Sequence, residues 1–339
     1  MSQATLDTRK LVVDSAPWVF QSLYVAAKLR LPDLLADGPR TAADLAAECE
    51  VHPQALYRFC RALAALGLFT EEPGERFTLT EAGGDLRSTA PGGLAHFVVV
   101  NGEESFRAWA DVLYSVRTGL PAFEHVFGMS HFDFLAANAE SSKSFNAMSG
   151  AGVPGVVAKY DFAGAAVIAD VGGGTGGLLA QVLERFPDAR GILQDTPAGV
   201  AEAEAFLTAH GLADRVEVVG RSFFEYLPTG ADVYVLSRVL HDWSDADCLR
   251  LLRALREAMG PDARIVVIDN VIPQVEGYHV GKFSDLQMLV VLGGRERTAK
   301  EMTDLLVEAG FAVTSTLTSD AVPGAPRSEA LFEARPTGN

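Results

Sequence analysis

The stretch Val171–Gly177, VGGGTGG, constrains the fold of this 339-residue chain more than any other. It follows a short apolar run at residues 166–171 and precedes a segment of helical periodicity at residues 178–186. Glycine lacks a Cβ atom, so such a loop can turn sharply and let its backbone approach a ligand closely. A strand, a glycine loop and a helix in this order are typical of the first unit of a parallel sheet.

The rest of the C-terminal part alternates short apolar runs with helical segments. The runs lie at residues 166–171, 190–194, 215–219, 233–236 and 264–268, with a terminal pair near 311–316 and 329–334. This alternation predicts an α/β fold with a Rossmann-like, doubly wound sheet, in which ligands bind at the carboxyl ends of the strands.

Residues 1–100 have a different pattern, which predicts a helical, winged-helix-like domain. Helices near residues 41–48 and 53–66 are followed by two short alternating runs around the turn at residues 72–75. The second helix carries only Arg58 and Arg61 as cations, so we expect a dimerisation domain, with a DNA-binding regulator as the weaker alternative. Residues 101–339 then form a second, larger domain, whose first part, at residues 103–160, is also helical.

Composition excludes several partners. The formal net charge of −16 repels a phosphate backbone or an anionic membrane, so we expect no nucleic acid and no membrane contact. The three cysteines show no metal-binding spacing, which predicts no metal site and fits a reducing compartment. The N-terminus lacks the pattern of a secretory signal and no apolar run is long enough to span a bilayer, so we predict a cytoplasmic protein.

The glycine loop alone leaves three interpretations open: an NAD site, an S-adenosylmethionine site, or a turn without a ligand. Gly172, Gly174 and Gly177 have the G-x-G-x-x-G spacing of dinucleotide sites. Asp170, directly before the loop, would repel a pyrophosphate and attract a cationic methionine moiety. Asp195 ends the next strand, where a carboxylate can accept from the ribose hydroxyls of either cofactor.

In this order and spacing, the stretches DVGGGTGG, LQDTP, GRSFFEYLP, VLSRVLHDWSD and GGRERT resemble the S-adenosylmethionine-dependent small-molecule O-methyltransferases of the plant caffeate and bacterial polyketide type. The resemblance covers nearly the whole chain, including the winged-helix dimerisation domain. It implies that residues 101–339 form the S-adenosylmethionine-binding catalytic domain, in which the helices at 103–160 cover the substrate. It implies S-adenosylmethionine as the cofactor, a homodimer, and methylation of a phenolic hydroxyl on an aromatic, polyketide-like secondary metabolite. It also implies a set of cofactor-binding residues, namely Asp170, Gly172, Gly173, Gly174, Asp195, Ser222, Phe223, Ser237 and Arg238.

Ser222 stands where the family usually has an aspartate that accepts from the adenine amino group. A neutral hydroxyl is a weaker acceptor than a carboxylate. The adenine contact therefore follows less directly from the resemblance than the ribose contact of Asp195.

His241 is the expected general base. It lies just after the carboxyl end of the fourth strand, on the edge of the sheet that faces the ligand, and histidine suits removal of a phenolic proton. The resemblance supplies Asp269 and Glu296 as the carboxylates that orient its ring. Asp242 either contacts the substrate or assists the helix cap at Ser244.

Aromatic and thioether side chains on the covering helices are the candidates for the substrate pocket: Trp109, Phe145 and Met148. The same spacing also suits a hydrophobic core. Some relatives carry out hydroxylation, decarboxylation or cyclisation instead of methylation. A base with two carboxylates argues against such a non-methylating reaction here, and the sequence does not identify the substrate.

Overall fold

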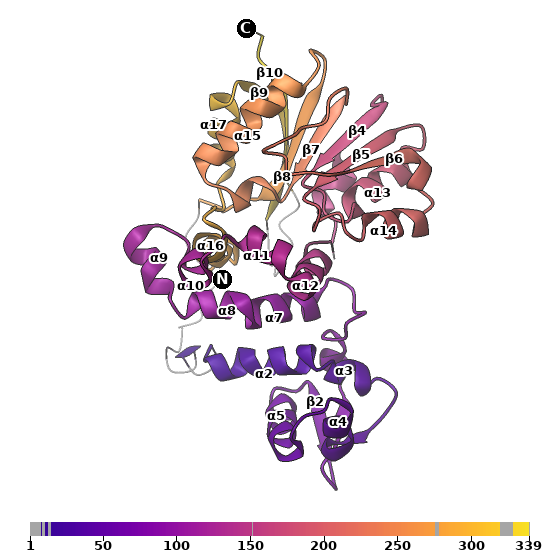
Figure 1. Cartoon of the computed structure of the whole chain (residues 1–339), viewed down its shortest axis with the longest axis vertical. Coiled ribbons are helices and arrows are strands. Elements are labelled where there is room, and N and C mark those ends of the chain that lie inside the picture. Colours follow the sequence, from indigo (N-terminus) through magenta and orange to yellow (C-terminus); the bar gives the residue numbers. More distant parts are fainter. Residues whose placement is uncertain are drawn as a thin grey trace, which may run out of the picture. The chain divides into compact units, whose positions relative to one another are not determined.

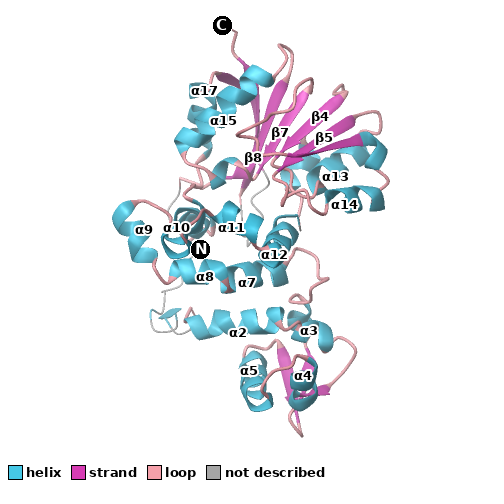
Figure 2. Cartoon of the chain, viewed as in Figure 1, coloured by secondary structure: helices cyan, strands magenta, loops and turns pink. Residues whose placement is uncertain are grey.

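The computed structural model describes residues 8, 11–12, 15–150, 152–274, 278–318 and 328–338 (Figure 1). The chain divides into two compact units, Met1–Phe106 and Arg107–Asn339. Figure 2 shows a small sheet in the first unit and a large sheet flanked by helices in the second. Within the described ranges, no helix is both long and apolar enough to cross a membrane.

The first unit contains the predicted helix-turn-helix and hairpin. Its helices are α2 (Pro17–Lys28), α3 (Leu31–Leu34), α4 (Ala42–Glu48), α5 (Pro53–Ala65), α6 (Glu81–Gly84) and α7 (Leu94–Gly102), and α8 (Glu104–Trp109) leads into the second unit. Strands β1 (Arg40–Thr41), β2 (Phe69–Glu72) and β3 (Arg76–Leu79) form an antiparallel sheet in the order β1-β3-β2. Thr41 caps α4 by accepting the Asp44 N–H at 3.0 Å, as its position predicts.

The second unit contains a seven-stranded sheet in the order β6-β5-β4-β7-β8-β10-β9. Its strands are β4 (Val167–Val171), β5 (Arg190–Asp195), β6 (Val216–Gly220), β7 (Val233–Ser237), β8 (Arg264–Asn270), β9 (Phe311–Thr318) and β10 (Glu329–Pro336). The first five are mutually parallel, and β10 lies antiparallel between β8 and β9. The doubly wound sheet predicted from the apolar runs is confirmed.

Helices cover both faces of this sheet. On one face, α15 (Asp245–Ala258) and α17 (Ala299–Glu308) pack in one hydrophobic cluster, and on the other α13 (Gly177–Arg185) and α14 (Ala203–Ala209) pack in a second (Figure 1). The preceding helices are α9 (Val112–Thr118), α10 (Ala122–Phe127), α11 (His131–Ala137) and α12 (Ala139–Gly150), and α16 (Gly281–Gln287) continues into a π-helical segment, Met288–Leu292.

The strand order explains where a ligand can bind. From β4 the chain proceeds outward through β5 to β6, whereas from β7 it proceeds in the opposite direction to β8. The loops that leave β4 and β7 therefore diverge, and a crevice opens at the carboxyl ends of these neighbouring strands. The glycine loop follows β4, and His241 follows β7 by a few residues.

Candidate active site

The glycine loop uses its own N–H groups inside the protein. The N–H groups of Gly172 and Gly173 donate to the Gln194 carbonyl at 2.7 and 3.1 Å. Gly174 donates to the Asp195 carboxylate at 2.9 Å. A pyrophosphate needs such N–H groups as donors, and here the first three in the loop are already engaged.

Asp170 is the most unusual group at this edge. It is 1% exposed, and neither carboxylate oxygen accepts a hydrogen bond of normal length and angle from the described residues. Burial raises the pKa of Asp170 to about 7, the charge of Asp195 adds to this, and the Arg238 guanidinium and the Leu179 backbone offset only part of it. A buried acceptor without a donor is costly, which indicates that a ligand supplies the donor.

Asp195 is in a different state from Asp170, although burial raises its pKa too. One of its oxygens accepts the Gly174 N–H at 2.9 Å and the other accepts the Thr196 N–H at 2.6 Å. A carboxylate has about four lone-pair positions, so both oxygens can still accept from a pair of hydroxyls.

The remaining predicted cofactor residues flank the loop. A Cβ atom at Gly172 would come within 2.7 Å of Val239 and within 3.6 Å of the Phe223 ring, so the close packing there requires glycine. The Ser222 hydroxyl accepts the Phe224 N–H at 3.3 Å.

Two polar residues end β7 beside this loop. The Ser237 hydroxyl is buried and makes no hydrogen bond with the described residues. Arg238 has a left-handed backbone, with φ of 55°, and its guanidinium donates to the Gly152 carbonyl at 2.5 Å. A non-glycine residue with such a φ is strained, and strain of this kind is concentrated at functional sites.

The donors and acceptors at this sheet edge distinguish between the two cofactors considered from the sequence, S-adenosylmethionine and a dinucleotide. Asp170 and Asp195 are acceptors with negative charge, so a suitable ligand brings donors and positive charge. S-Adenosylmethionine carries an ammonium, a sulfonium and two ribose hydroxyls, and it fits this set. A dinucleotide brings a pyrophosphate to a loop whose N–H groups are engaged, and it does not fit.

His241 lies in a short 3₁₀ turn, Leu240–Asp242, among three carboxylates. Its Nδ1 is 3.3 Å from Glu296 and 3.4 Å from Asp269, and its Nε2 is 3.3 Å from Asp242. Asp269 also accepts the His241 backbone N–H at 3.1 Å. Asp269 and Glu296 thus hold one side of the ring, and Asp242 faces the other.

The charges in this cluster are strongly coupled. Burial alone would lower the pKa of His241, but the charges of Asp269, Asp242 and Glu296 raise it to about 10. Burial raises the pKa of Asp242 to about 7 and that of Asp269 to about 6, with His241 opposing both. The pKa of Glu296 is lowered, despite burial, by its contacts with His241, Ser284 and Asn270. In the absence of a ligand, His241 is therefore an imidazolium at neutral pH.

Glu296 is held in position by the preceding helix, α16. Ser284 in α16 donates to its carboxylate at 2.6 Å, and the neighbouring Asp285 accepts the Glu296 N–H at 2.9 Å. These contacts fix the backbone and the side chain of Glu296 independently of His241. Ser284 and Asp285 were not predicted from the sequence, because nothing there indicates that α16 reaches this edge.

Arg297 joins the two segments that carry His241 and Glu296. It is 2% exposed, and its guanidinium donates to the carbonyls of Leu240 and Trp243, at 2.8 and 3.1 Å, and to Asp245 at 2.6 Å. The Arg297 guanidinium therefore holds the backbone on both sides of His241. Sequence reasoning missed this residue, because an arginine between polar neighbours is usually a solvated cation.

His241, Asp269 and Glu296 present ligand atoms that lie within 4.8 Å of one another, which is close enough for a metal ion. The hydrogen bonds already made by these groups give them another role, since Glu296 accepts from Ser284 and Asp269 accepts a backbone N–H. These hydrogen bonds fit a proton-holding cluster, and the absence of a metal ion stays a prediction.

The candidate substrate residues lie in two places. Phe145 contacts the His131 ring edge-on at 5.4 Å and lies 6.3 Å from Phe132. Trp109 packs in a separate cluster, and its indole N–H donates to Gln287 at 2.5 Å. Met148 is half-buried on α12.

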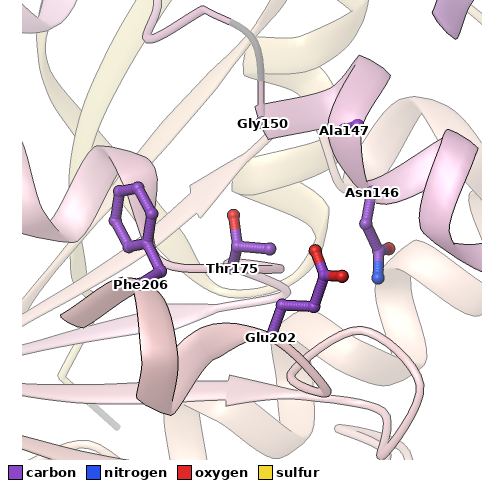
Figure 3. Close-up of a pocket in the computed structure, with 6 residues that line it drawn as sticks. All are labelled: Asn146, Ala147, Gly150, Thr175, Glu202 and Phe206. Atoms are coloured by element: carbon purple, nitrogen blue, oxygen red, sulfur yellow. The ribbon is translucent and has the colours of Figure 1, made fainter. Parts of the chain in front are cut away.

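A pocket of about 230 Å³ borders the glycine loop at Thr175. Figure 3 shows the side chains of Thr175, Glu202 and Asn146 turned toward a common space, with Phe206 at its side. None of the predicted cofactor or base residues lines this pocket.

Family models match most of the chain. An O-methyltransferase domain matches residues 109–312, and an O-methyltransferase dimerisation domain matches residues 15–86. The resemblance drawn from the sequence motifs is confirmed, and so is the presence of the dimerisation domain.

Individual relatives agree with the models. The phenazine O-methyltransferase of Lysobacter antibioticus is 42% identical, over 88% of this chain and 89% of that protein. The aclacinomycin 10-hydroxylase of Streptomyces purpurascens is 37% identical, over 88% of this chain and 82% of that protein. A solved O-methyltransferase from neocarzinostatin biosynthesis, in complex with S-adenosylmethionine and 2-hydroxy-5-methyl naphthoic acid, has a TM-score of 0.84 at 33% identity, and the match covers 98% of this chain and 100% of that one.

Proposed function

Because the chain belongs to the O-methyltransferase family, we propose that it transfers the methyl group of S-adenosylmethionine to a phenolic hydroxyl of an aromatic, polyketide-like metabolite. The observation that carries the proposal is the position of His241 among three carboxylates, at the same sheet edge as the glycine loop. The relatives named above act on aromatic metabolites, which supports the class of acceptor.

The cofactor is bound through acceptors and packing. Asp170 takes the cationic end, Asp195 takes the ribose hydroxyls, and Ser222 and Phe223 flank the adenine. S-Adenosylmethionine supplies an electrophilic methyl group on a cationic sulfur. Holding the acceptor oxygen beside it converts a bimolecular reaction into an effectively unimolecular one.

His241 removes the phenolic proton. Asp269 and Glu296 hold Nδ1, which fixes the ring, so Nε2, 3.3 Å from Asp242, is the nitrogen that takes the phenolic proton. The pKa of about 10 is close to that of an ordinary phenol, so proton transfer between the two is nearly balanced. Only the neutral imidazole accepts the proton, and the rate should therefore rise with pH through the neutral range.

Asp242 contacts the acceptor. Its carboxylate lies 3.3 Å from Nε2 of His241, where the acceptor hydroxyl must arrive. Ser244 caps α15 by its own hydroxyl, which accepts the Asp247 N–H at 3.2 Å, so Asp242 is not needed as the cap. Phe145 and Met148 provide apolar contacts, and Trp109 supports the pocket through Gln287.

The first unit forms a homodimer with a second copy of the chain. It contains the family's dimerisation domain, and three of its large apolar side chains are strongly exposed: Leu11 (47%), Val12 (64%) and Trp18 (68%). Exposed apolar surface of this kind marks an interface. Light scattering of the purified protein tests the assembly, and an active monomer at micromolar concentration contradicts it. The cytoplasmic location stays a prediction.

A second candidate is a non-methylating reaction on a similar metabolite, which the 37% identity with a hydroxylase favours. One experiment separates the two. The purified protein is incubated with isotope-labelled S-adenosylmethionine and aromatic metabolite extracts, and the products are identified by mass spectrometry. An oxygen-linked labelled methyl group supports the proposal, whereas a product that gains oxygen or loses carbon dioxide without the label supports the alternative.

A further inference from the structure

His131 is a buried histidine that neither the fold nor the proposed reaction explains. It is the first residue of α11, its side chain is 3% exposed, and neither ring nitrogen has a hydrogen-bond partner in the described part of the chain. Leaving a buried donor and a buried acceptor unpaired costs the full desolvation penalty of both. Buried polar groups in native proteins are nearly always paired, so each exception needs a reason.

Aromatic rings surround this histidine. Phe123 in α10 meets it edge-on at 4.9 Å, and Phe145 in α12 does so at 5.4 Å. Burial lowers the pKa of His131 to about 4, so the ring is neutral at physiological pH. A neutral imidazole offers one donor and one acceptor, and its apolar surroundings would penalise an unpaired anion.

The rings around His131 are continuous with the reaction centre in the same unit. Phe132, the next residue, stacks on Trp243 at 5.4 Å and 14°. Trp243 follows His241 by two residues and meets Phe223 edge-on at 5.8 Å, beside the glycine loop. An aromatic acceptor with its hydroxyl at His241 would therefore extend among the rings that contact His131.

We propose that His131 is a specificity-determining residue, which hydrogen-bonds a second, neutral polar substituent of the aromatic acceptor, such as a hydroxyl or a quinone carbonyl. This inference rests on the proposed function. Entry of the acceptor displaces the side chains that now cover the ring nitrogens, and its substituent satisfies one of them. The substrate class is then an aromatic with at least two oxygen substituents, of which one is methylated and another is recognised.

Binding to the protein saturated with S-adenosylhomocysteine tests this without turnover. The probes are 2-naphthol, with one hydroxyl, and a panel of dihydroxynaphthalenes that place the second hydroxyl at each ring position. We expect at least one diol to bind about 10- to 100-fold tighter than 2-naphthol, the effect of one buried hydrogen bond. His131→Phe, which keeps an aromatic ring, should abolish this preference and leave 2-naphthol binding within about twofold.

Two further variants control the result. His131→Asn keeps a donor and an acceptor and should retain part of the preference, including if the phenylalanine variant fails to fold. His125→Phe changes a histidine on the neighbouring α10 that already has a partner, Asp111 at 2.6 Å, and should change nothing. The inference is overturned if no diol is preferred by the wild type, or if His131→Phe affects 2-naphthol and the diols equally.

The outcome is separable from that of the proposed function. If His131 governs diol binding but no probe is methylated when S-adenosylmethionine replaces S-adenosylhomocysteine, the inference stands and O-methylation is in doubt. If the probes are methylated on oxygen while His131→Phe leaves the preference intact, the proposed function stands and the inference fails.

Discussion

The two halves of the candidate site are built in different ways. The half at the ends of β4 and β5 is local: the glycine loop folds on the Gln194 carbonyl and on Asp195, both from the next strand. The half at the ends of β7 and β8 is assembled from distant segments, because His241 depends on Asp269, on Glu296 and on Arg297.

The carboxylates of the two halves also differ. Asp170 has no donor among the described residues and awaits one from a ligand, whereas Asp269 and Glu296 are already engaged with His241. A group left unpaired before binding contributes to affinity when its partner arrives. A group already paired contributes to orientation and proton affinity. The comparison therefore predicts that changes in the first half alter binding and that changes in the second alter the rate.

The largest expected effect is on the rate, from His241→Ala. Loss of a general base should slow methyl transfer by about 10²- to 10⁴-fold and leave S-adenosylhomocysteine affinity unchanged. The loss should stay nearly constant through the neutral range, because the neutral fraction of His241 and the phenolate fraction rise together, and it should shrink only above about pH 10, where solvent supplies the phenolate. Single-turnover rates across pH, together with calorimetry, measure both. A wild-type rate at neutral pH would remove the base assignment and leave positioning alone as the source of catalysis.

The next effect is on binding, from Asp195→Ala. Hydrogen bonds to a charged acceptor are worth about 1.5–3 kcal/mol, so the affinity for S-adenosylhomocysteine should fall roughly 10- to 150-fold. Because Gly174 also donates to this carboxylate, part of the loss comes from the loop itself. Asp195→Asn keeps the size of the side chain and one acceptor oxygen and should lose less. Unchanged affinity by calorimetry would exclude Asp195 from the cofactor site.

The two halves of the site also differ in how much of each could be predicted from the sequence. Asp170, Asp195 and His241 follow from one rule, that residues at the carboxyl ends of parallel strands face the ligand. Asp269 satisfies the same rule, but its pairing with His241, and the whole assignment of Glu296, came only from the family resemblance.

The parts that the sequence did not predict depend on how separate segments pack against one another. Arg297 and Ser284 look like surface residues until the turn around His241 and helix α16 are brought together. His131, the first residue of the short helix α11, is buried because α11 packs against both α10 and α12 (Figure 1). No periodicity in the sequence encodes such contacts.

A smaller effect on the rate is expected from Arg297→Lys. Lysine keeps the charge but loses the fork that holds the carbonyls of Leu240 and Trp243 together with Asp245. The rate should fall by roughly tenfold, below the 10²-fold that a misplacement of about 1 Å can cost. The pH dependence of the rate should shift, since the distances from His241 to Asp269, Asp242 and Glu296 set the pKa of the imidazole. Affinity for S-adenosylhomocysteine should stay the same.

Arg295→Lys is the matched control for this change. Arg295 also contacts Asp245, at 3.3 Å, but its side chain is 43% exposed, and exposed ion pairs contribute little. Its rate and pH profile should equal those of the wild type. If both lysine variants behave alike, or if Arg297→Lys loses stability without any shift in the pH profile, Arg297 is merely structural.

The last expected effects are on stability, and they distinguish Asp170 from His241 by pH. The folded-state pKa of Asp170, about 7, lies above its unfolded value of about 3.8, so the folded state binds the extra proton and stability falls as pH rises between these values. The Asp170→Asn side chain cannot ionise, so the free energy of unfolding of this variant should rise relative to that of the wild type from pH 4 to pH 7, with little further change above pH 7.

The folded-state pKa of His241, about 10, lies above the unfolded value of about 6.5. Its stabilisation is complete below the unfolded value and is lost as pH rises through about 10. The advantage of the wild type over His241→Gln should accordingly shrink between pH 7 and pH 10, a range in which Asp170→Asn shows no such change. Thermal unfolding of the three proteins across pH measures both windows, and an advantage over His241→Gln that stays constant between pH 7 and pH 10 would contradict the raised pKa of His241.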